Sequence, residues 1–157
     1  MKKFIQNKLK EQKGLTLIEL LAVIVILAII AAIAIPAIGN IIENSRYSAI
    51  KSDATNIMAA ADVFYADGNK GASDTLVTVT ELKNAGYLDD AGSFEADAAA
   101  TSVTKAVIAN GATAAAPAKI SGKAVVGNVK LTLTGASRQD VNAIKRDSLP
   151  GTVKKTT

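Results

Sequence analysis

The chain of 157 residues is long enough for one compact domain beside a hydrophobic segment. It lacks His and Cys. The usual ligands of zinc and copper are therefore missing, as are the commonest acid–base group and the thiol nucleophile of enzymes, and we expect a protein that is not an enzyme. The formal net charge of +4 is carried by the first fourteen residues: removing their five Lys and one Glu from 18 basic and 14 acidic residues leaves 13 of each. The remainder lacks the basic excess typical of nucleic-acid-binding domains.

An uninterrupted apolar run dominates the N-terminal third of the chain. Nineteen residues from Leu20 to Ile38 carry no charge and no side-chain hydroxyl, enough for one helix across the ~30 Å hydrocarbon core of a bilayer. Lys residues before such a run keep its N-terminal end in the cytoplasm, which predicts a single pass with the rest of the chain outside. Two alternatives are an ordinary secretory signal, whose apolar region is shorter at about 7–15 residues, and a plain membrane anchor.

The boundary between the basic leader and the apolar run reads KGLTLIE over residues 13–19. With its flanks, this segment resembles the class III signal of type IV pilin precursors, a superfamily that includes the pseudopilins. The resemblance implies that a prepilin peptidase removes residues 1–14 by cutting after Gly14 and then methylates the new N-terminal residue, Leu15. Leu15 is the one departure, because Phe is usual there; the matching positions are Gly14, Thr16, Leu17, Ile18 and Glu19. Many pilins of diderm bacteria close their C-terminal loop with a disulfide, so the absence of Cys favours a Gram-positive source.

Glu19 places a carboxylate at the edge of the apolar run. A charge costs about 2.5–3.5 kcal/mol at the centre of a bilayer and less near the interface. One interpretation is that Glu19 marks the cytoplasmic boundary and reaches toward water. The resemblance implies another, in which Glu19 pairs with the α-amine that cleavage creates at Leu15, one helical turn away. Such a pair would align an incoming subunit inside the low-dielectric core of a filament, and we favour this assembly role.

Pro36 and Gly39 lie late in the predicted apolar helix. A proline in a helix interior removes one backbone hydrogen bond and costs ~3 kcal/mol, although membrane helices tolerate the resulting kink. Glycine lowers helix propensity further. The resemblance implies that the segment before the proline, residues 28–35, loses helicity when subunits pack in a filament.

From residue 41 the apolar side chains fall on one face only. Their 3-4-3-4-3 spacing predicts an amphipathic helix, with the stripe Tyr47, Ile50, Ala54, Ile57, Ala61 and Phe64. We expect one helix over residues 15–65, with a transmembrane and assembly half (15–40) and an amphipathic half (41–66). A coiled coil is the alternative use of the stripe, but fewer than three heptads make a weak case.

Residues 67–157 are expected to form a globular head. Thr78 and Glu81 match a capping box that opens a short helix, and Gly86 fits its C-terminal end. Ser137 is a candidate N-cap for a last short helix, with Val141 and Ile144 facing the core.

Three segments of the head carry strand signals: residues 103–109, 119–126 and 129–134. Gly127-Asn128 is typical of the two-residue turn of a β-hairpin. In the last segment Val129, Leu131 and Leu133 alternate with polar residues, so one face of the sheet should pack on the helix stripe. The expected fold is α+β: a long N-terminal helix on a small antiparallel β-sheet head, the pilin fold.

Two charged clusters in the head invite a functional interpretation. The acidic one could bind calcium, as a loop of type II secretion pseudopilins does, or form a solvated loop, which we favour; it consists of Asp89, Asp90, Glu95 and Asp97. The basic one could contact DNA phosphates in a filament or belong to a solvated, frayed C-terminus, which we favour; it consists of Lys145, Arg146, Lys154 and Lys155.

The resemblance implies a structural subunit of a type IV pilus. It would cross the cytoplasmic membrane once with its head outside, then join a helical homo-oligomer at the cell surface that serves adhesion, motility, aggregation or DNA uptake. The partners implied are the prepilin peptidase, an assembly ATPase and a platform protein, with no cofactor. The alternatives are a pseudopilin of a type II secretion or competence system and, from another class, a membrane-tethered binding module.

Overall fold

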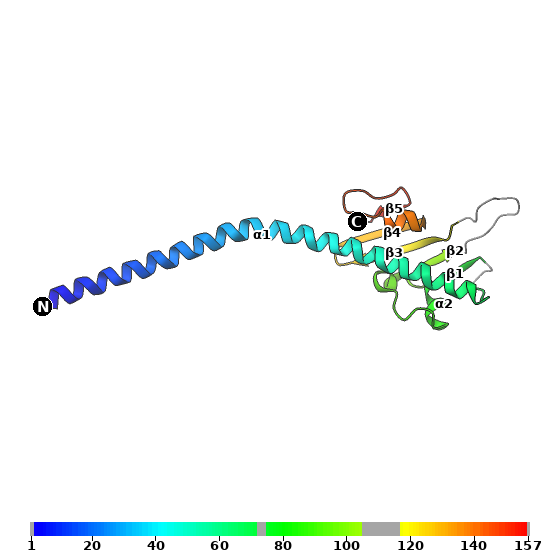
Figure 1. The fold of residues 1–157 in the computed structure, drawn as a ribbon, viewed down its shortest axis with the longest axis horizontal. Helices are drawn as coiled ribbons and strands as arrows, with labels where there is room; N and C mark the ends of the chain where they lie inside the picture. The colour runs from blue at the N-terminus through cyan, green and yellow to red at the C-terminus, as the bar shows by residue number, and fades with distance from the viewer. Residues whose placement is uncertain (1, 72–74, 105–116, 157) are drawn as a thin grey trace. The chain divides into compact units, whose positions relative to one another are not determined.

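The computed structural model describes residues 2–71, 75–104 and 117–156, with residues 2–16 and 104 described by their backbone alone. The chain divides into two units, Met1–Ile41 and Ile42–Thr157. Figure 1 traces the chain from the long helix α1 into the sheet and short helices of the second unit. The expected α+β architecture, a long N-terminal helix followed by an antiparallel sheet, is confirmed.

Helix α1 (Lys2–Ala66) starts well before the expected position at residue 15. The helix was expected to start at residue 15 because the leader is predicted to be cut there. A cleavage site does not by itself interrupt a helix. Residues 2–13 contain neither Pro nor Gly, and nine of these twelve residues are Lys, Gln, Leu or Glu, which are good helix formers. A single Gly at position 14 weakens a helix without ending it.

The C-terminal end of α1 has a clear local cause. Gly68 adopts a left-handed backbone conformation with φ of 80°. Its N–H donates to the carbonyl of Tyr65 at 3.1 Å, and the N–H of Asn69 donates to the carbonyl of Phe64 at 3.3 Å. This pair of hydrogen bonds is the Schellman motif, which satisfies the last carbonyls of a helix.

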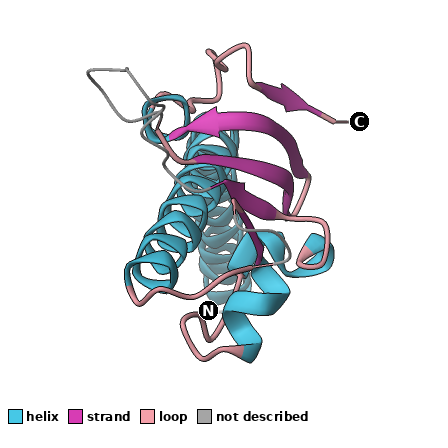
Figure 2. Ribbon diagram, turned by 90° about the vertical axis from the view of Figure 1, so that its right-hand side faces the viewer, coloured by secondary structure: helices cyan, strands magenta, loops and turns pink. Residues whose placement is uncertain are grey.

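The predicted stripe on the second half of α1 is confirmed as the helical side of the core. All six of its residues are buried, and Met58 and Tyr65 join them. They form one cluster with apolar side chains from the strands, from Phe94 and from the short helices. Figure 2 shows the sheet lying along one side of this half of the helix.

The sheet has five antiparallel strands in the order β1-β2-β3-β4-β5, which is also their order in the chain. The strands are β1 (Leu76–Thr78), β2 (Ser102–Thr104), β3 (Lys119–Val126), β4 (Val129–Ser137) and β5 (Val153–Lys155). The predicted hairpin is confirmed in its register, since Val126 pairs with Val129 across Gly127-Asn128. The predicted alternation in β4 is also confirmed: Val129, Leu131 and Leu133 are buried, whereas their neighbours are exposed or half-buried.

Three features of the sheet differ from expectation. Strands β1 and β5 were not expected, because a three-residue strand has too few positions to show an alternating pattern. The C-terminus was expected to fray, but Val153 pairs with Leu133 and Lys155 with Leu131. Strand β4 continues to Ser137, beyond the expected end. The strand expected over residues 103–109 overlaps β2, and residues 105–116 lie outside the described part of the chain.

The short helices of the head follow their capping signals. Helix α2 (Val79–Asn84) opens with the predicted box, in which Thr78 and Glu81 each bind the other's backbone N–H. It ends at Asn84, and Gly86 follows its C-cap with φ of 79°. Helix α3 (Arg138–Asn142) opens with a second box between Ser137 and Asp140. Between these helices a 3₁₀ helix, η1 (Gly92–Asp97), replaces part of the expected acidic loop.

Hydrogen bonds lower the pKa of two carboxyl groups in the head. The backbone N–H of Ser137, followed by its hydroxyl, lowers the pKa of Asp140 below its ordinary value of 3.8. The side chain of Lys83, followed by the N–H of Ala91, lowers the pKa of Glu95 below 4.5. A carboxyl group whose pKa is lower in the folded than in the unfolded state stabilises the folded state at pH values above the unfolded pKa. This stabilisation is lost as the pH falls through the folded pKa.

We therefore expect the free energy of unfolding of the unit Ile42–Thr157 to fall as the pH drops below about 4.5. In the double variant Asp140→Asn/Glu95→Gln the fall should be shallower. Urea unfolding at a series of pH values measures this, with Asp89→Asn as the control because this exposed carboxylate has no hydrogen bond within the described residues. Equal slopes in the double variant and the unmodified unit would contradict the assignment.

Candidate functional site

The first part of α1 presents apolar side chains on every side. All sixteen large apolar residues from Leu17 to Ile42 are exposed, from 47% for Ile42 to 71% for Ile33. Burial of one such side chain contributes about 1.5–3 kcal/mol, so covering this surface would contribute on the order of tens of kcal/mol. Within the described residues α1 is also the one helix long and apolar enough to cross a membrane. This surface requires a lipid or protein environment.

Glu19 is the one charged residue within this apolar surface, and its side chain is exposed. It lies four residues after Leu15 in the continuous helix α1, so the backbone places the two residues one turn apart. Gly14 and Leu15 belong to the same helix, but their side chains lie outside the part that the structure describes. The helix therefore supplies the spacing that a carboxylate–amine pair needs.

Helix α1 continues without interruption through Pro36 and Gly39. Because proline has no N–H, the carbonyl of Ala32 lacks its usual partner at this turn. A Cβ atom added at Gly39 would meet no other atom within 4 Å, so packing does not require glycine there. The local loss of helicity over residues 28–35 is expected of a packed filament, and it stays a prediction.

Residues 9–35 match a known protein family, the prokaryotic N-terminal methylation motif. The match includes Gly14, Leu15 and Glu19. The N-terminal segment is that of a type IV pilin-like prepilin. The matched span is 27 of the 157 residues and ends before Pro36. No curated protein and no solved structure gives a significant match to the chain.

A prepilin signal of this kind is processed by the prepilin peptidase and leads to assembly in a type IV pilus or a secretion machinery. The apolar helix near the N-terminus is compatible with a membrane anchor before assembly. The motif points to a structural, pilin-like protein. It does not distinguish a pilus from a pseudopilus.

Three of the four acidic residues considered for calcium already bind groups of the head itself. Asp90 Oδ1 accepts from the N–H of Gly92 at 2.9 Å, Asp97 Oδ2 accepts from the N–H of Lys123 at 3.0 Å, and Glu95 pairs with Lys83. No group of three or more acidic side chains suited to a metal ion is found among the described residues. A calcium site stays the untested alternative to the solvated loop that we favour.

The basic residues considered for DNA contact have two different environments. Arg146 and Lys155 both approach Glu43 of α1, at 3.8 Å each, whereas Lys145 and Lys154 are exposed. Glu43 could not be predicted as a partner of these residues, because an acid 103 residues before Arg146 gives no local signal. Contact with DNA stays an untested alternative.

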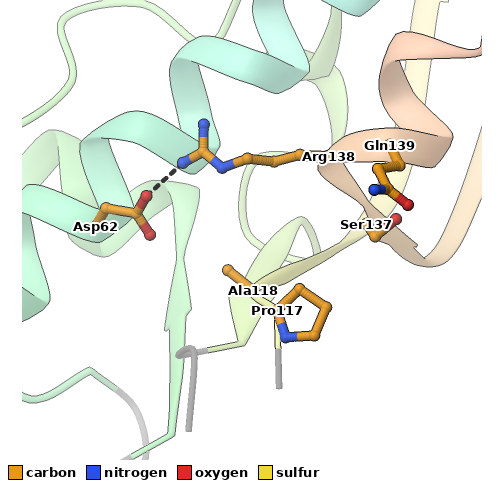
Figure 3. Close-up of a pocket in the computed structure, with 6 residues that line it drawn as sticks. All are labelled: Asp62, Pro117, Ala118, Ser137, Arg138 and Gln139. Carbon is orange, nitrogen blue, oxygen red and sulfur yellow. Dashed lines mark hydrogen bonds and ion pairs between the residues drawn. The ribbon is translucent and has the colours of Figure 1, made fainter. Parts of the chain in front are cut away.

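A hollow of about 310 Å³ lies between the second half of α1 and the start of α3, and Figure 3 shows the residues that line it. Its lining residues are Asp62, Pro117, Ala118, Ser137, Arg138 and Gln139. The dashed line marks the ion pair between Arg138 and Asp62. Among the described residues that line the hollow, Arg138 and Asp62 are the charged ones, and each neutralises the charge of the other.

Proposed function

We propose that the mature chain is a structural subunit of a type IV pilus. The peptidase cuts after Gly14, methylates the new terminus at Leu15 and leaves the chain anchored by its apolar helix with the head outside. An assembly ATPase and a platform protein then draw the subunit out of the membrane into a helical filament. The finished pilus serves adhesion, motility, aggregation or DNA uptake.

The observation that supports this proposal is the apolar surface of residues 17–42, which surrounds the helix on all sides. A membrane anchor uses such a surface against lipid, and a filament uses it against copies of the same helix. A tethered binding module needs the anchor alone, but it needs neither the methylation motif nor Glu19 at the edge of the run. The motif and the acid together favour a filament.

Immunogold labelling of native cells with an antibody to the head tests the proposal. We expect label along the length of long surface filaments, and loss of both label and filaments when the gene is deleted. Label confined to the cell envelope, in cells whose surface filaments persist after deletion, would contradict a pilus role. A pseudopilin would give that pattern.

A further inference from the structure

The charges of the head are segregated along the chain. Residues 42–104 contain ten acidic and four basic residues, whereas residues 105–157 contain two acidic and nine basic residues. Because the strands lie in the sheet in chain order, this segregation along the sequence becomes a segregation across the head. The mature chain as a whole is formally neutral.

The basic side is the outer face of strands β3, β4 and β5. Lys123 pairs with Thr132, and Thr132 pairs with Lys154, so these three form one row across the sheet. Val125 and Lys130 form the next row. None of the three strands contains an acidic residue. We call this surface the lysine face; it consists of Lys123, Val125, Lys130 and Lys154.

One carboxylate reaches this face, where Asp97 Oδ2 accepts from the backbone N–H of Lys123 at 3.0 Å. Lys123, Lys130 and Lys154 are exposed, and within the described residues none of the three forms an ion pair. Val125 lies between them and is 43% exposed. The face therefore combines positive charge with a small apolar centre.

The acidic side includes a hollow of about 490 Å³ between the second half of α1 and residues 87–90. We call it the acidic hollow; it is lined by Asn56, Ala59, Ala60, Val63, Tyr87, Leu88, Asp89 and Asp90. Val63 is 53% exposed, and both Asp89 and Asp90 are exposed at the rim. Within the described residues after Ile42, Val63 and Val125 are the two exposed large apolar side chains.

The rim of the acidic hollow is held in place by Tyr87. Its hydroxyl donates to Asp67 Oδ2 at 2.7 Å and accepts from Asn69 Nδ2 at 2.8 Å. Its ring packs edge-on against Phe64, with centroids 5.4 Å apart. An ordered rim lowers the entropy that a partner must overcome on binding.

We propose that the lysine face of one copy docks on the acidic hollow of the next copy. Each surface has one exposed valine, and the two surfaces carry opposite charge. A second copy of this chain therefore offers each surface a partner of opposite charge with an apolar side chain. The two surfaces are different patches, which makes the contact heterologous, and a heterologous contact that does not close produces an open filament. This inference rests on the proposed function and goes beyond it by naming the two surfaces through which neighbouring heads contact each other.

Charge reversal and its compensation test the contact in cells that make the full chain. Lys130→Glu/Lys154→Glu should lower the yield of sheared filaments at least tenfold, because like charges then face each other. Asp89→Lys/Asp90→Lys should do the same. Combining the four substitutions should restore the yield, since opposite charges face each other again. Leader removal and the circular dichroism of the purified chain in detergent should stay unchanged in all three.

The matched control is Lys51→Glu/Lys145→Glu, which makes the same change in net charge outside the lysine face and should preserve filaments. Normal filaments from either reversed variant, or no recovery in the combined variant, would overturn the docking while leaving the proposed function standing. Normal filaments that lose binding to double-stranded DNA in the lysine variant would also overturn it, in favour of a polyanion-binding face. Absence of filaments from the unmodified chain would instead remove the proposed function, and the docking with it.

Discussion

Replacing Gly14 by Leu is expected to leave the leader attached and to abolish filaments. Glycine lets the backbone approach another surface closely, and a bulky side chain at the cut site would obstruct the peptidase. The uncut chain also keeps five Lys and one Glu on the cytoplasmic side. Extraction would draw these charges through the bilayer, at about 2.5–3.5 kcal/mol for each Lys at its centre.

Mass spectrometry of the membrane-bound chain measures the outcome for Gly14→Leu. The matched control is Gly39→Leu, the same exchange in the same helix at a position where an added Cβ meets no neighbour within 4 Å. Cleavage should be complete in the control and undetectable in Gly14→Leu. A Gly14→Leu chain that begins at Leu15 would show that another residue directs the cut.

Replacing Glu19 by Gln is expected to leave cleavage intact and to lower the yield of filaments at least a hundredfold. Cleavage creates a positive α-amine at Leu15, one turn before Glu19 in α1. In the apolar interior of a filament this amine needs a negative partner. Removing one member of a buried ion pair costs about 3–5 kcal/mol, and each 1.4 kcal/mol is a factor of ten in an equilibrium constant.

The comparison that isolates this effect is Glu11→Gln. It removes the same charge eight positions earlier, in the leader that the mature subunit no longer contains. Quantifying sheared filaments and leader removal in the same cultures separates assembly from processing. Wild-type filament yield from Glu19→Gln would mean that Glu19 only marks the membrane boundary.

Elements with a strong local signal could be predicted from the sequence. The turn at Gly127-Asn128, the alternation in β4 and the capping residue Thr78 each depend on neighbours within a few positions. The stripe on α1 has a period that only a helix satisfies. The N-terminal motif works in the same way, because its Gly, Glu and apolar run are contiguous.

What the sequence did not reveal depends on contacts between distant segments. Strand β5 has three residues and exists because β4 offers an unpaired edge. Glu43 gains its basic neighbours through the path of the whole head. The lysine face requires the register that places Thr132 between Lys123 and Lys154, and no spacing along the chain encodes that row.

The most direct test of the central claim is the N-terminal residue and intact mass of the chain in filaments sheared from native cells. We predict a chain that begins at Leu15 and carries one N-methyl group. A chain that still begins at Met1 and is found only in membranes would contradict it, and the apolar helix would then be the anchor of a membrane-tethered module.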